Sequence, residues 1–145
     1  MHIIGAGGHA KVVIDILLSN KLTTIEVWDE NLAAKSPLGF PIQGNLLNFK
    51  KLNSDQVIVA IGNNKVRKKV ASDLKTTANC IHFTSAISPS ASIGIGTVIM
   101  ANASVNADAT VGDHVIINTN ASVDHDCIIG DFVHISPQAG LAGNV

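Results

Sequence analysis

The residues from Ser85 to Val145 carry a six-residue repeat that continues for ten cycles. One position of each cycle is always a large apolar residue, and the position two residues earlier is small or slender. The large residues are Ile87, Ile93, Ile99, Val105, Val111, Ile117, Val123, Ile129, Ile135 and Leu141. A helix repeats near 3.6 residues and a half-buried strand at about 2, so neither explains a strict period of six. The pattern predicts a parallel β-helix in which each hexad supplies one short strand and one turn.

Glycine adds a second period, of eighteen residues, to this repeat. Gly94, Gly112 and Gly130 each follow a large apolar residue, which indicates that three hexads complete one triangular coil. We expect residues eighteen apart to stack at the spacing of neighbouring strands, about 4.8 Å. We also expect these glycines to mark a corner where the backbone needs a positive φ, because glycine adopts that conformation most readily.

The charged residues divide the chain into two parts. All ten Lys and Arg precede residue 84 together with six acidic residues, which gives that part a formal charge of +4, whereas the remainder holds five Asp and carries −5. We therefore predict an N-terminal domain over residues 1–83 and a β-helix of about three and a half coils over residues 84–145. The net charge of −1 gives no reason to expect a nucleic-acid partner.

The N-terminus and the cysteines point to a cytoplasmic protein. The opening segment has no basic region followed by a long apolar run, as a signal peptide would. No apolar stretch reaches the roughly 18 residues that a membrane-spanning helix needs. Cys80 and Cys127 form no disulfide framework, as expected in a reducing compartment.

The N-terminal domain begins with the order strand, glycine-rich turn and helix. Residues 2–4 are apolar, residues 5–11 read GAGGHAK, and an apolar helical pattern continues to Leu18. A second strand over residues 25–28 ends at Asp29, so an acid follows the glycines at about the spacing of a dinucleotide-binding fingerprint. Such a turn offers backbone N–H groups to phosphate. The domain is long enough for only half of a doubly wound nucleotide fold, which favours a mononucleotide or nucleotide-sugar over NAD. A plain tight turn is the alternative.

The remaining N-terminal segments complete a parallel α/β sheet. We expect a loop over residues 31–44, a short helix over 45–52, a buried strand over 56–61 and a helix over 65–76. Val66, Val70 and Leu74 would form the apolar face of the last helix, and its cluster of basic residues would form the solvated face: Lys65, Arg67, Lys68 and Lys69. Because ligands bind at the carboxyl edge of such sheets, a site should bring together the residues at three strand ends, namely Gly7, Gly8, Asp29, Gly62 and Asn63.

Chemistry on the repeat is sought at polar residues that the architecture does not require. These are Asn118, His134 and the run Asp124-His125-Asp126. Neither histidine occupies an inward position, and an acid beside a histidine raises its basicity, as a general base needs. A solvated turn histidine is the simpler alternative for each. Asp113 and Asp131 follow glycines and are interpreted as turn residues.

Two other chemistries are weaker alternatives. A metal hydratase would need zinc on three histidines, for which His114, His125 and His134 are available at different hexad phases. We expect no metal. Covalent catalysis through Cys127 is disfavoured because its hexad phase points inward.

Three segments together resemble a known family over the whole chain. They read IIGAGGHAKVV, VIVAIGNNKVRKK and VIINTNASVDHDCIIGDFVHISPQAGLAGNV. They are similar to the bacterial sugar acetyltransferases that modify sialic acid or UDP-4-amino-sugars. The resemblance implies a half-Rossmann nucleotide-sugar domain followed by a left-handed parallel β-helix, a homotrimer, and acetyl-CoA as co-substrate. It alone implies the handedness.

The resemblance also implies roles for individual residues. His125 corresponds to the catalytic base and Asp126 to its supporting carboxylate, which is often Glu in the family. Asn118 and His134 match positions near the acetyl group, and Gly143 matches a main-chain contact that could steady an oxyanion. The phosphate-binding loop of the family is matched by Gly7, Gly8, His9 and Lys11. The acid near the nucleobase is matched by Asp29.

The implied function is direct acetyl transfer from acetyl-CoA to an amino-sugar nucleotide or to sialic acid. Family members continue for several more coils before a cap. We therefore expect the chain ending at Val145 to be a truncated form, or one whose end another chain covers. The alternative function is a trimeric nucleotide-sugar-binding or assembly module without activity.

Overall fold

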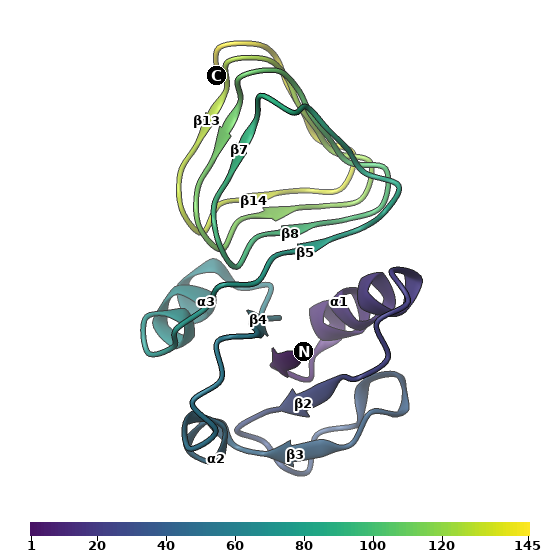
Figure 1. Cartoon of the computed structure of the whole chain (residues 1–145), viewed down its shortest axis with the longest axis vertical. Coiled ribbons are helices and arrows are strands. Elements are labelled where there is room, and N and C mark those ends of the chain that lie inside the picture. Colours follow the sequence, from purple (N-terminus) through teal and green to yellow (C-terminus); the bar gives the residue numbers. More distant parts are fainter.

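The computed structural model describes residues 1–145, and it places a small α/β sheet layer against one side of a triangular β-helix (Figure 1). The sheet layer has four parallel strands in the order β3-β2-β1-β4. Their bounds are β1 His2–Ile4, β2 Glu26–Trp28, β3 Ile42–Gly44 and β4 Val57–Val59. The predicted parallel α/β fold is thus confirmed.

Two α-helices and one 3-10 turn connect these strands, and a third α-helix leads from β4 into the β-helix. They are α1 Gly8–Ser19, η1 Pro37–Gly39, α2 Leu46–Lys50 and α3 Asn64–Ala71. The strand β3 is an addition, because residues 31–44 are predicted as a loop from their prolines and glycines. It pairs at the edge of the sheet with an irregular register opposite Val27 and Trp28. None of the helices has the length and apolar character needed to cross a membrane.

The prediction for α3 is wrong at Arg67 and at Val66, and the helix ends at Ala71 rather than at residue 76. Arg67 is not on a solvated face but is only 1% exposed, and the buried residues of α3 are Arg67 and Ala71. Val66 is instead 46% exposed, because this side of the helix borders a cavity. Amphipathic spacing could not show that a cation has enough acceptors to be buried.

The β-helix consists of two-residue strands on three faces, each of which is a parallel sheet, as the hexads predict. The faces are β14-β11-β8-β5, β15-β12-β9-β6 and β13-β10-β7. Partners are eighteen residues apart, so that Ile116 pairs with Val98 on one side and with His134 on the other. The bounds are β5 Cys80–Ile81, β6 Ala86–Ile87, β7 Ser92–Ile93, β8 Val98–Ile99, β9 Ser104–Val105, β10 Thr110–Val111, β11 Ile116–Ile117, β12 Ser122–Val123, β13 Ile128–Ile129, β14 His134–Ile135 and β15 Gly140–Leu141.

The two parts of the chain share one apolar core. The face β14-β11-β8-β5 points toward the α/β layer, with α1 packed beside β5 (Figure 1). Val98 and Ile116 from this face belong to the same buried cluster as Ile3, Val13 and Ile58. A second cluster fills the interior of the β-helix with the large residues of the hexads. The sheet layer is therefore held at a fixed position on the β-helix.

The corner glycines do not have the predicted conformation. Positive φ begins at Gly96 and recurs at every sixth residue, namely Asn102, Asp108, His114, Asn120, Asp126, Phe132, Gln138 and Asn144. Gly94, Gly112 and Gly130 are not among the positive-φ residues. Glycine is needed at position 94 because successive coils stack closely there. A Cβ on Gly94 would lie 2.5 Å from the carbonyl oxygen of Gly112.

Asp113 and Asp131 fix these crowded corners. Asp113 Oδ1 accepts a 2.8 Å hydrogen bond from the N–H of Ile95, and Asp131 Oδ1 accepts one of 2.8 Å from the N–H of Asp113. Each carboxylate thus joins its corner to the preceding coil. Their interpretation as turn residues is confirmed.

Gly112 and Gly130 provide a matched test of the stacking argument. A Cβ on Gly112 would lie 2.8 Å from the backbone N of Asp131, whereas one on Gly130 would meet nothing within 4 Å. We expect Gly112→Ala to lower the free energy of unfolding by about 1–3 kcal/mol through overpacking. We expect Gly130→Ala to be neutral or stabilising by up to about 1 kcal/mol. Urea denaturation measures both, and equal losses would contradict the argument.

Candidate active site

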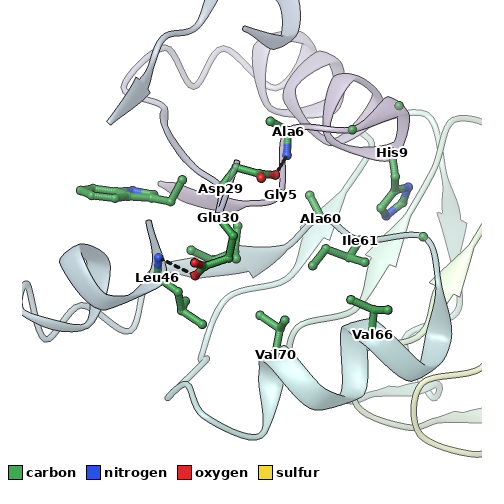
Figure 2. Close-up of a pocket in the computed structure, with 15 residues that line it drawn as sticks. Gly5, Ala6, His9, Asp29, Glu30, Leu46, Ala60, Ile61, Val66 and Val70 are labelled. Atoms are coloured by element: carbon green, nitrogen blue, oxygen red, sulfur yellow. Dashed lines mark hydrogen bonds between the residues drawn. The ribbon is translucent and has the colours of Figure 1, made fainter. Parts of the chain in front are cut away.

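A cavity of about 490 Å³ lies at the carboxyl edge of the sheet, where the strand ends meet (Figure 2). Its wall comes from residues 4–9, residues 28–30 and residues 60–62, and Leu46, Val66 and Val70 complete it. The predicted Gly7, Gly8, Asp29 and Gly62 are all in this wall. The cavity is thus formed by the turns that follow β1, β2 and β4.

The start of α1 offers this cavity unpaired backbone donors. Gly7 precedes the helix with φ −79° and ψ −167°, and no side chain caps the helix or places an acid in its first turn. A Cβ on Gly7 or Gly8 would meet nothing within 4 Å, so the backbone is open to an approaching ligand. The free N–H groups and the positive end of the helix dipole can bind an anion such as phosphate.

Two acidic residues behind the loop have different roles. Asp29 Oδ2 accepts a 2.7 Å hydrogen bond from the N–H of Ala6, and Oδ1 accepts one of 2.8 Å from the N–H of Asn31. Its carboxylate therefore fixes the glycine loop. Glu30 Oε1 accepts a 3.0 Å hydrogen bond from the N–H of Leu46, and its other oxygen remains free to accept from a ligand (Figure 2). The sequence interpretation did not select Glu30, although it directly follows Asp29.

His9 lies in the cavity wall with a neutral ring. Its Nε2 is buried and has no hydrogen-bond partner. Burial, reinforced by the positive charge of Arg67 and by His134, lowers the pKa of His9 from 6.5 to about 4. At neutral pH the ring can therefore bind a polar ligand group without carrying charge.

Two other predicted ligand residues do not line the cavity. Lys11 is exposed on α1. Asn63 caps α3, with its Oδ1 accepting a 3.1 Å hydrogen bond from the N–H of Val66.

His125 forms a separate polar cluster on an outward corner of the β-helix. Its Nδ1 lies 2.7 Å from Asp126 Oδ2, and both side chains are 53% exposed. The hydrogen bond to Asp126 raises the pKa of His125, and the charge of Asp124 adds to this effect. Asp124 Oδ1 also holds the corner, because it accepts from the N–H of His125 and from Asn106 Nδ2, each at 2.8 Å. The hydrogen bond to Asp126 uses Nδ1 of His125 and leaves its Nε2 without a hydrogen-bond partner in the chain.

The imidazole ring of His125 lies against Gly143, which is on the next coil. A Cβ at position 143 would lie 2.6 Å from both Cε1 and Nε2 of that ring, so only glycine leaves space for it. The N–H of Gly143 donates no backbone hydrogen bond. An open groove of about 540 Å³ runs beside His125 along the ends of β6 and β9.

Asn118 and His134 form a third polar group, on the β-helix face that meets the α/β layer. Asn118 Nδ2 lies 2.9 Å from His134 Nε2. Burial, with a smaller contribution from Arg67, lowers the pKa of His134. A neutral ring can accept through Nε2, so we assign the amide of Asn118 as the donor.

The histidines do not assemble as zinc ligands. His114 is buried and its ring stacks on Phe132 with centroids 5.2 Å apart, whereas His125 and His134 lie in the two clusters described above. No three His, Cys, Asp or Glu side chains are grouped closely enough to hold a metal ion. Cys127 is buried inside the β-helix, as predicted.

Comparison with known proteins finds a matching family model for each part of the chain. The family model of the PglD N-terminal domain matches residues 1–74. The chain belongs to the PglD family. Residues 108–143 match the model for the six repeats of the bacterial transferase hexapeptide, and the β-helix of this PglD-type chain is accordingly left-handed.

Solved structures of sugar acetyltransferases share this fold over nearly the whole chain. A point mutant of GDP-perosamine N-acetyltransferase from Caulobacter crescentus, solved with CoA and GDP-perosamine, is 39% identical with a TM-score of 0.88, covering 98% of this chain and 70% of that one. The acetyltransferase domain of PglB from Neisseria gonorrhoeae, solved with acetyl coenzyme A, is 41% identical with a TM-score of 0.91, covering 99% and 73%. WeeI from Acinetobacter baumannii is 26% identical with a TM-score of 0.87, covering 99% and 72%.

A curated relative is much longer than this PglD-type chain. It is an uncharacterised protein of Acanthamoeba polyphaga mimivirus, 36% identical over 107 residues. The match covers 72% of the present chain, which spans only 22% of the viral protein.

The opposite surroundings of His9 and His125 can be tested by NMR titration. We expect the ring of His9 to remain neutral until about pH 4 and the pKa of His125 to lie above 6.5. Asp126→Asn should lower the pKa of His125 and leave that of His9 unchanged.

His9 also makes stability depend on pH. Its folded pKa of about 4 is below the unfolded value of 6.5, so its contribution to stability is present above pH 6.5 and is lost as the pH falls toward 4. A titration of His9 near pH 6.5 in the folded protein would contradict its burial.

Proposed function

We propose that this chain transfers an acetyl group from acetyl-CoA to the amine of a nucleotide-linked amino-sugar. The observation that carries the proposal is the exposed His125–Asp126 hydrogen bond of 2.7 Å on a hexapeptide β-helix. Similarity to GDP-perosamine N-acetyltransferase and to a PglB domain that binds acetyl coenzyme A supports the choice of both substrates. The same similarity favours an amine over the hydroxyl of sialic acid as the acceptor.

We assign nucleotide-sugar recognition to residues 1–83 and acetyl transfer to residues 84–145. In the cavity, the phosphates would accept hydrogen bonds from the N–H groups at Gly7 and Gly8, close to the positive end of α1. The neutral ring of His9, in the cavity wall, would lie against the sugar or a phosphate. The free carboxylate oxygen of Glu30 would accept a hydrogen bond from an N–H of the nucleobase.

The transfer step would be direct, with His125 as the general base. The amine nitrogen attacks the thioester carbonyl carbon, a C–N bond forms, and Nε2 of His125 takes the proton that the nitrogen loses. Asp126, hydrogen bonded to Nδ1, stabilises the resulting imidazolium. The tetrahedral intermediate then collapses, the C–S bond breaks, and the CoA sulfur receives the proton.

Other residues would position the acetyl group and its developing charge. The N–H of Gly143 makes no backbone hydrogen bond and lies beside the His125 ring, so it can stabilise the oxyanion. Asn118 and His134 would bind near the acetyl group or the CoA chain. Cys127 takes no part, because it is buried in the β-helix.

The proposal includes a homotrimer, as in the family that the chain resembles. The groove beside His125 is open along the β-helix surface. A neighbouring subunit would cover it and exclude water from the reacting groups.

Gly8→Ala tests the cavity as the nucleotide-sugar site. Because a Cβ there meets no atom within 4 Å, we expect an unchanged or slightly higher melting temperature. The methyl group would keep phosphates from the backbone and weaken GDP-perosamine binding at least about tenfold, or roughly 1.4 kcal/mol, in calorimetry. Ser19→Ala, at the other end of α1, is the control. Unchanged affinity for GDP-perosamine in Gly8→Ala would exclude this site.

His125→Ala tests the general base. We expect CoA release to fall by about 10²–10⁴-fold while the affinity for GDP-perosamine stays within twofold. Asp126→Asn should give a smaller loss and move the acidic limb of the kcat/KM profile to lower pH, because it lowers the pKa of His125. Wild-type protein that binds GDP-perosamine but never releases CoA with any amino-sugar nucleotide would instead indicate a binding module.

A further inference from the structure

Arg67 is the most completely hydrogen-bonded side chain between the two parts of the molecule. Its five N–H groups find five acceptors, although no carboxylate forms an ion pair with it. Nε donates to the carbonyl of His114 at 2.9 Å. One terminal nitrogen donates to the carbonyls of Ile61 and Gly62, at 3.0 and 3.1 Å. The other donates to Asn64 Oδ1 at 3.0 Å and to the carbonyl of Phe132 at 2.7 Å.

These acceptors belong to the two sites that the proposed function has to bring together. Ile61 and Gly62 belong to the wall of the proposed nucleotide-sugar cavity. His114 and Phe132 stand eighteen residues apart, at the same positive-φ corner of successive coils. Phe132 lies two residues before His134, which contacts Asn118. One guanidinium therefore connects the cavity wall directly to the coil that carries the proposed acetyl-binding pair.

The buried charge also affects the neighbouring histidines. Arg67 is 1% exposed. Burial of His9 and His134 is the main cause of their lowered pKa values, and the positive charge of Arg67 lowers both further. No carboxylate forms an ion pair with Arg67. A neutral His134 keeps its Nε2 as an acceptor for the amide of Asn118.

We propose that Arg67 is a positioning residue that sets the distance between the nucleotide-sugar cavity and the Asn118–His134 pair. The inference rests on the proposed acetyl transfer for its kinetic meaning, but the connection itself is a property of the free chain. Lysine cannot replace arginine here, because an ammonium group has three donors and cannot reach five acceptors in a planar fork. The cavity wall and the corner at Phe132 would then move independently.

Arg67→Lys is the informative variant, with Lys69→Met on the exposed side of α3 as its matched control. In hydrogen-exchange measurements on the ligand-free chain, we expect Arg67→Lys to speed exchange about tenfold or more. The increase should appear both at residues 61–67 and at the backbone around residues 114–116 and 132–134. Residues 104–106 and 122–124, on another face, should be unchanged. Lys69→Met should match wild type throughout.

Kinetics separate positioning from simple destabilisation. Misplacement of bound reactants costs up to about 10²-fold in rate. We therefore expect Arg67→Lys to lower kcat by about 10–100-fold at saturating GDP-perosamine and acetyl-CoA, while the calorimetric Kd for GDP-perosamine changes less than threefold. Faster exchange confined to α3, or a uniform increase over the whole chain, would overturn the proposal. So would wild-type kcat in the folded variant.

The failure of the proposed function would look different. In that case wild-type protein and both variants would release no CoA. The exchange pattern of Arg67→Lys would still decide whether the residue couples the two sites.

Discussion

Stacking at eighteen residues is the constraint on which the rest of the structure depends. Each residue of the β-helix lies over its equivalent on the next coil, as Ile116 lies between Val98 and His134. Backbone hydrogen bonds join the coils, as from the N–H of Ile116 to the carbonyl of Val133. The same rule operates at the corners, where glycine is needed at position 94 because the carbonyl of Gly112 is so close. It also explains the seat of His125, whose ring lies against Gly143 eighteen residues later. A functional side chain is thus positioned by the coil above it as much as by its own.

The α/β layer depends on this frame for more than attachment. Its core continues into the β-helix through Val98 and Ile116, so neither part is closed without the other. At the edge of this common core lies Arg67, buried without an ion pair. A buried charge is costly unless its hydrogen bonds are satisfied, and here all the acceptors are backbone carbonyls except Asn64 Oδ1. Carbonyls have fixed positions, so the satisfied guanidinium also fixes the relative position of the elements that supply them.

The sequence predicts periodic features well and exceptions poorly, for physical reasons that individual residues illustrate. The burial of Ile99, Ile117 and Ile135 can be predicted from their spacing, because this position of the hexad points into the β-helix. The recurrence of glycine at position 112 indicates that a side chain is not tolerated there. Spacing cannot distinguish whether the cause is a positive φ or close contact between coils. Arg67 lies among lysines in the sequence, so local composition predicts that it belongs to a solvated helix face. Its burial follows from carbonyls up to 65 residues away, at Phe132, which no local pattern contains.

The histidines show how the same side chain acquires different chemistry from its position. The half-exposed side chain of His125 lies beside Asp126 and Asp124, and the hydrogen bond to Asp126 together with the charge of Asp124 raises its pKa. His9 and His134 lie where burial and the charge of Arg67 act together, and both have a lowered pKa. A base is useful only if it is the group that takes the proton. Burial, reinforced by the charge of Arg67, keeps the rings of His9 and His134 neutral as hydrogen-bonding groups. In the proposed mechanism, proton transfer is then the task of His125, the exposed histidine that Asp126 and Asp124 support.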